Sequence, residues 1–527
     1  MHDDDLTTRP HRHFHLPSDS GLNTAEAAAR PLPGTGRQAT AETEAGLSPL
    51  ALEIAQSLQT KTISPRVLVG SARLIDLAII VLIGAATLST SIVGATVAPW
   101  MPISALLVAL ILAAAIFQAA DCYQIPVMRT ALPQAGRIVT AWSLVAGVIL
   151  VAGDYLMLPH LPESWLGLWY GLTLATLLIF RAVLSLFVQH WTRSGRLERR
   201  AIIVGGGETA ADLIHEIEAQ PDNDIRICGI FDDRGNDRSP ANVAGYPKLG
   251  TVADLVQFGR IARIDMLIVT IPMRAEKRLV EFLQKLWVLP VDIRLSAHTD
   301  KMRFRERASS FIGTVPFVDV IDRPVADWDA ISKRAFDLIA ASLLVVPLAP
   351  VMLAVAAAIR LESKGPALFR QKRYGFNNEV IEVLKFRSMY HDLADPAARK
   401  AVTKDDPRVT RVGRFIRKAS LDELPQLFNV LKGDLSLVGP RPHAVNAHTD
   451  ERLWEQVVDG YFARHKVRPG VTGWAQINGW RGEVDTPEKI QKRVEYDIYY
   501  IENWSIFFDI LILLKTPFAL FNTENAY

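Results

Sequence analysis

Two adjacent carboxylates, Asp422 and Glu423, stand in the octapeptide ASLDELPQ at residues 419–426. Ser420 and Glu423 match a Ser-x-x-Glu capping box, in which both side chains bind backbone N–H groups at a helix start. Pro425 agrees with such a start, because proline is tolerated in the first turn of a helix. Paired acids also suit a reaction centre, where one attacks and the other binds a metal ion. The octapeptide alone leaves both interpretations open.

Basic residues on both sides of the acid pair favour phosphate chemistry. Arg417 precedes Asp422, and Arg441 follows in the motif Gly-Pro-Arg-Pro. Guanidinium groups bind phosphate through two parallel hydrogen bonds. A carboxylate is a competent nucleophile for an acyl-phosphate intermediate, while Mg²⁺ and the arginines would neutralise a diphosphate. In this context the pair is predicted to be a reaction centre, placed at a helix start that keeps Asp422 ionised.

The sequence blocks around the pair cover most of residues 332–527. In order they are KRAFDL, FRQKRYG, KFRSM, SLDELPQLFNVLKGDLSLVGPRP, RPGVTGWAQING and YDIYYIENWS. This region resembles the bacterial sugar transferase family, the polyprenyl-phosphate phosphoglycosyl transferases that carry one re-entrant membrane helix. The whole chain resembles the long form of that family, and most nearly its undecaprenyl-phosphate glucose phosphotransferases, which begin exopolysaccharide synthesis.

The resemblance implies a reaction and a role for each matching residue. A hexose 1-phosphate, with glucose as first choice, would pass from a UDP-sugar to undecaprenyl phosphate, with release of UMP. Asp422 would attack the β-phosphorus and hold the sugar phosphate covalently. Glu423 would ligate Mg²⁺ as the metal cofactor, and Arg417 and Arg441 would bind phosphates.

Other basic residues carry over from the same resemblance. Lys333 and Arg334, at the start of the membrane helix, would face the anionic headgroup of the lipid acceptor. Lys385 and Arg387, in KFRSM, would bind substrate. These two residues and Asp497 could equally form structural ion pairs.

Four apolar stretches, at residues 74–97, 101–120, 138–158 and 165–188, each approach the roughly 20 residues that cross a bilayer. They form a predicted membrane domain at 67–192, after a polar tail at 1–66 that is predicted to be disordered. Lys and Arg residues lie before the first pass, in the middle connection and after the fourth pass, whereas the other two connections contain none. The positive-inside rule therefore predicts that the N-terminus, the middle loop and the part after Arg193 are cytoplasmic, and the resemblance implies a multi-pass protein of the bacterial inner membrane.

Charged residues also occur inside the four passes. They are Asp76, Asp154 and Arg181, and each lies towards one end of its pass. Intramembrane charges are costly and often functional. Because long side chains near a helix end can reach the interface, these three are expected to do so.

A fifth apolar segment, residues 334–361, is long enough to span but carries Pro347 and Pro350 at its middle. Proline removes a backbone hydrogen bond and disfavours a straight helix. Both flanks are basic, which places both ends on the cytoplasmic side. The segment is predicted to enter, break at Pro350 and leave on the same face, with a proline-kinked span as the alternative.

Residues 198–325 alternate between apolar strand-like and amphipathic helix-like segments, which predicts a Rossmann-like parallel α/β domain. Gly205 and Gly207 form a glycine turn after the first strand, and Asp232 ends the second. This pattern matches a dinucleotide fingerprint, so the turn either binds a nucleotide or only shapes a tight strand–helix connection. No tyrosine in the sequence begins the Tyr-x-x-x-Lys pair that nucleotide-sugar dehydratases need.

The sequence thus predicts a multi-domain membrane protein. It comprises a four-helix transmembrane bundle, a cytoplasmic Rossmann-like α/β domain, and an α/β catalytic domain at 330–527 with a re-entrant helix. Its predicted partners are a UDP-sugar, undecaprenyl phosphate and membrane lipid. A net charge of +2 gives no indication of a nucleic-acid partner. A homodimer through the Rossmann-like domain stays open, as does the identity of the sugar.

Three rival functions fit parts of the sequence. A membrane-bound nucleotide-sugar dehydratase would share the front half but needs the missing Tyr-x-x-x-Lys pair. A glycosyltransferase with an Asp-x-Asp metal motif would use Asp327 and Asp329, which fall in a predicted linker. A non-enzymatic scaffold would leave the acid pair and its arginines unexplained.

Overall fold

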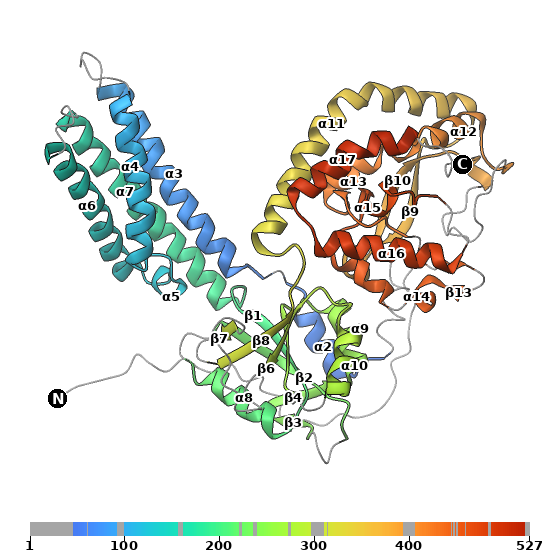
Figure 1. Cartoon of the computed structure of the whole chain (residues 1–527), viewed down its shortest axis with the longest axis horizontal. Helices are drawn as coiled ribbons and strands as arrows, with labels where there is room; N and C mark the ends of the chain where they lie inside the picture. Colours follow the sequence, from blue (N-terminus) through green and yellow to red (C-terminus); the bar gives the residue numbers. More distant parts are fainter. Residues whose placement is uncertain are drawn as a thin grey trace, which may run out of the picture. The chain divides into compact units, whose positions relative to one another are not determined.

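The computed structural model describes residues 46–521 except 61, 92–99, 156–161, 221–223, 236–239, 272–275, 297–309, 313–314, 394–405, 444, 446–447, 450–451, 459 and 483–485. One compact unit holds an α/β sheet, and the other holds the apolar helices and the C-terminal domain (Figure 1). Five helices in the described part are long and apolar enough to cross a membrane.

Four of these apolar helices pack on one another. Helix α3 contacts α4 and α7, and α6 contacts α4 and α7. Their bounds are Pro65–Ser91 for α3, Trp100–Ala119 for α4, Ala131–Tyr155 for α6 and Glu163–Arg193 for α7, with the short α5 at Ile125–Met128. Small residues such as Ala109 and Ala113 are fully buried between them, which lets the helices approach closely.

Two of the charged residues inside these helices pair with each other. The Arg181 guanidinium forms an ion pair with Asp76, and their side chains are 2% and 0% exposed. Arg181 also donates to the Cys122 carbonyl at 3.2 Å. The expectation that Asp76 and Arg181 reach the interface is therefore wrong, because each neutralises the other inside the bundle. The side chain of Asp154 lies outside the described residues.

The α/β unit is an eight-stranded mixed sheet in the order β3-β4-β2-β1-β5-β6-β8-β7. Strands β1, β5 and β6 pair in parallel, while β3, β7 and β8 pair antiparallel with their neighbours. The bounds are Arg199–Val204 for β1, Ile225–Phe231 for β2, Asn242–Val243 for β3, Tyr246–Gly250 for β4, Met266–Val269 for β5, Asp292–Ser296 for β6, Ser310–Ile312 for β7 and Val315–Ile321 for β8. The parallel centre agrees with the predicted α/β fold, and antiparallel strands extend the sheet on both sides.

Three helices follow strands of this sheet, and one comes from the N-terminal segment. Glu208–Glu218 forms α8, Val252–Ile261 forms α9 and Glu276–Leu286 forms α10. Helix α2, Pro49–Ser57, is capped by Ser48 and buries Ala51, Ile54 and Ala55 in the sheet's hydrophobic core. The predicted disorder of residues 1–66 is therefore wrong for α2, and residues 1–45 lie outside the described part.

The fifth apolar helix, α11, runs without interruption from Asp327 to Glu362 and contains both Pro347 and Pro350. Figure 1 shows it as one curved helix. The predicted break at Pro350 is therefore wrong, because the helix curves but continues through both prolines. Proline is a common cause of bends in helices. Asp327 and Asp329 lie in the first turn of α11, which corrects their placement in a linker.

The C-terminal domain contains two small sheets. Strands β9 (Leu368–Tyr374) and β10 (Val380–Phe386) pair antiparallel, and β11 (Ser436–Val438) and β14 (Gly470–Thr472) pair in parallel. Helices α12 (Arg411–Lys418), α13 (Gln426–Lys432), α16 (Pro487–Glu502) and α17 (Ile506–Phe521) complete the domain. Its core joins Leu427 and Val430 of α13 to Leu437 of β11 and Tyr500 of α16.

Short elements fill the connections of this domain. They are the pair β12 (His448–Thr449) and β13 (Arg452–Leu453), the helices α14 (Trp454–Val457) and α15 (Trp474–Ile477), and the 3₁₀ turns η2 (Phe376–Asn378), η3 (His391–Leu393), η4 (Leu421–Glu423) and η5 (Tyr461–Lys466). The acid pair lies on η4, between α12 and α13.

Candidate active site

The acid pair lies on a tight turn rather than at a capped helix start. Ser420 has φ of 58°, makes no capping hydrogen bond through its side chain, and its N–H donates to the Arg417 carbonyl at 3.1 Å. A left-handed residue of this kind commonly ends a helix, so Ser420 closes α12. The predicted capping box is wrong, because the seven-residue helix α13 starts only at Gln426, after Pro425.

Glu423 is held by two cations. Arg441 places Nη2 2.5 Å from Glu423 Oε1 and Nη1 3.2 Å from Oε2, a two-point guanidinium–carboxylate pair. Lys385, on β10, lies 3.1 Å from Oε1. Although burial alone would raise it, Arg441 and Lys385 hold the pKa of Glu423 well below its ordinary value. Glu423 is therefore a fixed anion.

Asp422 lacks the side-chain partners that hold Glu423. Within the described part of the chain its carboxylate makes no side-chain hydrogen bond, and the residue is half-buried. Burial raises the pKa of Asp422, with Lys385 opposing that effect and the charge of Glu423 adding to it. The expectation that a helix start keeps Asp422 ionised is wrong, because Asp422 lies on η4 before α13, where burial raises its pKa and Lys385 and Arg417 oppose that effect. Two carboxylates with separated pKa values suit two different roles.

Of the two arginines predicted to bind phosphate, Arg441 touches the acid pair directly. Arg417 lies in the last turn of α12, and its charge lowers the pKa of Asp422 less than Lys385 does. The structure thus brings Lys385 and Arg441 to Glu423, next to Asp422, and the catalytic roles of these four residues stay predictions. Their hydrogen bonds connect η4, β10 and the segment after β11.

Three more arginines belong to this cluster and were missed from the sequence. Arg481 donates to Ser420 Oγ, and burial followed by Arg441 lowers the pKa of Arg481. Burial and Arg441 also lower the pKa of Arg373 and of Arg493 to about 10 each. Arg373 lies in FRQKRYG and Arg481 in INGWRG, but only tertiary structure brings these two near the charge of Glu423, while Arg493 donates to the Gly482 carbonyl.

Other predicted site residues contact the backbone instead. Arg387 is 3% exposed and donates to the carbonyls of Ser363 and Lys364, at the end of α11. Arg334 donates to the Val430 and Leu431 carbonyls at 2.5 and 2.7 Å, at the end of α13. Guanidinium groups at helix C-termini satisfy carbonyls that have no partner within the helix.

Two further predicted residues lie in buried ion pairs. Asp497 pairs with Arg464, and both side chains are almost fully buried, which agrees with the structural alternative. Lys333 is 8% exposed and lies between Asp337 and Asp509. The lipid-facing environment expected for Lys333 is therefore wrong.

The glycine turn of the α/β unit is tied to its own acid. Gly205 and Gly207 have φ of 102° and 87°, which glycine adopts at low cost. The Gly206 N–H donates to Asp232 Oδ2 at 2.7 Å, and Arg234 donates to both Asp232 oxygens. The glycines thus shape a tight connection whose acid already has partners, and nucleotide binding there stays a prediction.

The acid pair can supply only part of the ligand shell of a Mg²⁺ ion. Within the described residues, no group of three or more His, Cys, Asp or Glu side chains could hold a metal ion. Mg²⁺ often binds only one or two carboxylates and completes its shell with substrate phosphates and water. Glu423 fits that pattern as a single carboxylate ligand, and it would share its oxygens between the metal and Arg441 or Lys385.

Two family models match this chain. The one described as bacterial sugar transferase matches residues 328–523, and the one described as CoA-binding domain matches residues 118–297. The first range contains the acid pair and every cation that surrounds it. The second begins in the apolar helices and extends to β6.

Curated relatives match at high identity. The chain is 41% identical over 367 residues to an undecaprenyl-phosphate glucose phosphotransferase of Komagataeibacter xylinus, covering 68% of this chain and 66% of that protein. It is 38% identical over 366 residues to a UDP-glucose:undecaprenyl-phosphate glucose-1-phosphate transferase of Escherichia coli, covering 69% and 76%. A UDP-N-acetylgalactosamine-undecaprenyl-phosphate N-acetylgalactosaminephosphotransferase of Aeromonas hydrophila is 44% identical over 188 residues, covering 36% and 43%. The chain therefore belongs to the bacterial sugar transferase family, in its long form.

Proposed function

We propose that the protein transfers a hexose 1-phosphate from a UDP-sugar to undecaprenyl phosphate and releases UMP, as the first membrane step of exopolysaccharide synthesis. The observation that carries this function is the pairing of an unbonded carboxylate, Asp422, with a neighbour whose charge Arg441 and Lys385 fix. The printed activities of the relatives agree with it. A free carboxylate beside fixed cations is suited to attack on a phosphorus atom of a negatively charged diphosphate.

The reaction proceeds in two displacements at one phosphorus atom. In the first, an Asp422 oxygen forms a bond to the β-phosphorus while the bond from that phosphorus to the bridging oxygen breaks and UMP leaves. In the second, a phosphate oxygen of the lipid forms a bond to the same phosphorus, and Asp422 leaves as a carboxylate. The lipid then carries a diphosphate-linked sugar, and the enzyme returns to its starting state.

The charge around Asp422 supports an anionic substrate. Lys385 and Arg441 contact Glu423. The charges of Arg441 and Glu423 also affect the pKa values of Arg373 and Arg481. The cations outnumber the two carboxylates, so the site carries excess positive charge until a polyphosphate enters. Preorganised cations of this kind stabilise charge that develops on phosphate oxygens.

Glu423 would hold Mg²⁺. The metal supplies charge neutralisation on the diphosphate, and the arginines position the remaining phosphate oxygens. Chelation by EDTA is expected to abolish UMP release, and added Mg²⁺ to restore it. Full activity in EDTA-treated, metal-free buffer would exclude the metal requirement.

Contacts at both ends of α11 support its re-entry into the membrane. Near its start, Asp337 accepts the Leu437 N–H at 3.1 Å, and near its end Glu362 accepts the Val412 N–H at 3.1 Å. A straight helix of this length would extend about 54 Å at 1.5 Å per residue, yet both ends bind the same domain. Exposed side chains such as Leu343, Val346 and Leu353 would meet lipid. The catalytic domain would then lie on the cytoplasmic face of the bacterial inner membrane, and the four packed helices α3, α4, α6 and α7 would span it.

Glucose is the proposed sugar, because four relatives that match about two thirds of this chain are glucose enzymes by name. The N-acetylgalactosamine enzyme matches only 36% of the chain, so an N-acetylated hexose is the second candidate. Membranes that contain the protein are incubated with undecaprenyl phosphate and a panel of radiolabelled UDP-sugars. The expected result is labelled lipid and stoichiometric UMP with UDP-glucose. Absence of both products with every sugar would contradict the proposed function.

A further inference from the structure

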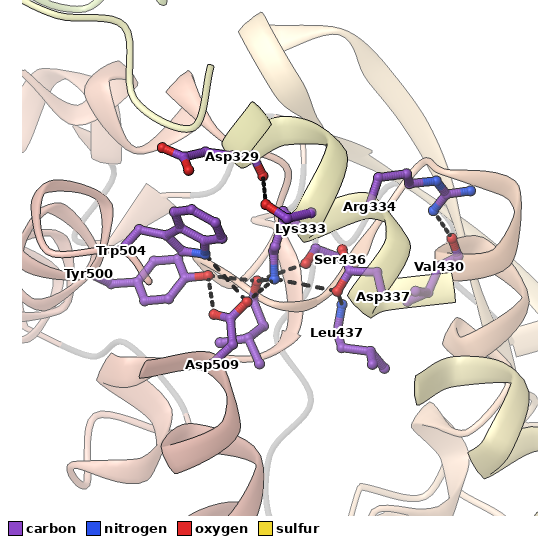
Figure 2. A network of polar contacts seen from close by, with 12 residues as sticks. Asp329, Lys333, Arg334, Asp337, Val430, Ser436, Leu437, Tyr500, Trp504 and Asp509 are labelled. Carbon is purple, nitrogen blue, oxygen red and sulfur yellow. Dashed lines mark hydrogen bonds and ion pairs between the residues drawn. The ribbon is translucent and has the colours of Figure 1, made fainter. Parts of the chain in front are cut away.

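A buried polar network lies near the start of α11, with Lys333 at its centre (Figure 2). The Lys333 ammonium lies 2.5 Å from Asp509 Oδ2, 3.3 Å from Asp337 Oδ1 and 3.0 Å from the Val438 carbonyl oxygen. Lys333 is 8% exposed, Asp337 1% and Asp509 0%. The network therefore joins α11, β11 and α17 out of contact with water.

Aromatic donors complete the same network. The Tyr500 hydroxyl lies 2.7 Å from Asp509 Oδ1 and 3.0 Å from the Val438 carbonyl oxygen, and Trp504 Nε1 lies 3.3 Å from Asp509 Oδ2. Figure 2 shows Tyr500 and Trp504 approaching Asp509 from the side opposite to Asp337. The Val438 carbonyl accepts from Lys333 and from the Ser436 hydroxyl at 2.9 Å, and it shares the single Tyr500 proton with Asp509.

An ammonium group has three N–H donors. Asp337, Asp509 and the Val438 carbonyl supply three acceptors at hydrogen-bond distance. A phosphate could bind Lys333 only by displacing one of them. Lys333 is therefore committed to the protein interior, which argues against a direct role in lipid headgroup binding.

The strand that Lys333 holds leads straight to Arg441. After Val438, the Gly439 N–H donates to the Thr472 carbonyl and the Pro440 carbonyl accepts the Gly470 N–H, both at 2.9 Å. A Cβ atom on Gly439 would lie only 2.6 Å from the Arg468 carbonyl oxygen. This segment has little space to adjust, so a shift of Val438 moves Arg441.

We propose that Lys333 is a positioning residue that sets Arg441 against Glu423 by holding the Val438 carbonyl, and that it thereby couples the start of α11 to the reaction centre. The inference rests on the proposed function. Burying an ion pair costs desolvation free energy, and apolar residues can often replace such a pair without loss of stability. The contribution proposed for Lys333 is therefore the placement of Arg441 and not the stability of the fold. Displacement of a catalytic group by about 1 Å can cost ~100-fold in rate.

The test measures the first displacement alone, by exchange of labelled UMP into UDP-glucose in membranes without added undecaprenyl phosphate. With Lys333→Met we expect exchange to fall ~100-fold in kcat with a small change in KM for UDP-glucose. Lys432→Met is the matched control, because Lys432 forms an ion pair with Asp434 and its side chain is 73% exposed. Exchange by that control should equal wild type.

The same assay separates positioning from lipid binding. If Lys333 bound the lipid phosphate, Lys333→Met would leave UMP exchange unchanged and raise only the KM for undecaprenyl phosphate, and this outcome would overturn the proposal. Lys333→Arg retains a phosphate-binding charge but not the compact ammonium geometry, so we expect it to lose exchange as well. Exchange near wild type in Lys333→Arg would also contradict the proposal.

A second variant guards against misfolding of Lys333→Met, which leaves two buried carboxylates without their cation. Tyr500→Phe keeps Lys333 and both acids but removes the hydroxyl that lies 2.7 Å from Asp509 Oδ1 and 3.0 Å from the Val438 carbonyl oxygen. We expect a ~10-fold loss in kcat for exchange, equivalent to one hydrogen bond to a polar group. Unchanged exchange in a folded Tyr500→Phe protein would overturn the proposal. Absence of exchange in wild type would instead contradict the proposed function itself.

Discussion

Arg441 and Glu423 form a two-point ion pair across the site, with N···O distances of 2.5 and 3.2 Å. The pair joins the turn that carries the acids to the segment after β11. The Arg464 guanidinium also donates to the Arg441 carbonyl at 2.7 Å, and Arg373 donates to the Pro442 carbonyl at 2.5 Å. Both the side chain and the backbone of Arg441 are therefore fixed before any substrate arrives, as electrostatic catalysis requires.

Replacement of this guanidinium by an ammonium should impair the reaction. A lysine carries the same charge but cannot make two parallel hydrogen bonds to Glu423. We expect Arg441→Lys to lower kcat/KM for UDP-glucose by about 10- to 100-fold, the equivalent of one lost hydrogen bond to a charged group. Steady-state UMP release measures the effect.

Arg370→Lys is the control for that experiment. Arg370 pairs with Glu382 on the surface, and the two side chains are 70% and 55% exposed. Exposed pairs contribute about 0–1 kcal/mol, so this variant should retain wild-type activity. Equal losses in the two variants would contradict a specific role for Arg441.

The nucleophile is tested by trapping the intermediate. Because a neutral carboxamide is a much weaker nucleophile than a carboxylate, Asp422→Asn should abolish both UMP exchange and lipid product, with a fold indistinguishable from wild type by circular dichroism. Wild type incubated with UDP-glucose labelled in its β-phosphate should acquire label in the protein when lipid acceptor is withheld. Turnover by Asp422→Asn would exclude Asp422 as the nucleophile.

Motif order made much of this site predictable from the sequence. Asp422, Glu423 and Arg441 lie in blocks whose residue types already indicate phosphate chemistry, and the structure joins Glu423 to Arg441 directly. The local pattern of Ser420 gave a wrong prediction, because the same residues end α12 rather than begin α13. A capping box depends on backbone conformation, and a φ of 58° at Ser420 excludes the geometry that it needs.

Partners distant in sequence could not be predicted. Lys333 pairs with Asp509 across 176 positions, and Asp76 pairs with Arg181 across 105. Lys333 was expected at the lipid headgroup and Asp76 and Arg181 at the membrane interface, whereas each is buried with an opposite charge. Helix α2 was missed for a related reason, since its stability comes from packing on the α/β core rather than from its own composition.

Arg481 tests whether the missed arginines contribute to substrate binding. It donates to Ser420 Oγ beside the acid pair, and burial with Arg441 lowers its pKa. We expect Arg481→Gln to raise the KM for UDP-glucose about tenfold, since it removes one charge-assisted contact to phosphate. The KM for undecaprenyl phosphate should change less. A KM for UDP-glucose equal to that of wild type would assign Arg481 to the turn alone.

The pH dependence of stability should depend on His443, next to the segment that carries Arg441. Burial and Arg464 hold the pKa of His443 well below 6.5, and Nδ1 accepts from the Tyr461 hydroxyl at 2.7 Å. An unfolded chain binds a proton on this histidine below pH 6.5, whereas the folded domain does not. Folding stability should therefore fall as pH drops below 6.5, by up to about 1.4 kcal/mol per pH unit, and be fully retained above it.

Pulse proteolysis in urea, applied to the detergent-solubilised full chain at pH 7.5, 6.5 and 5.5, would measure this loss through the fraction of intact C-terminal domain. His443→Gln removes the titrating group but keeps a carbonyl oxygen that can accept from Tyr461 or Arg464. We expect it to be less stable than wild type at pH 7.5 and to lose less stability on acidification. An equal loss in both proteins would assign the acid sensitivity to groups other than His443.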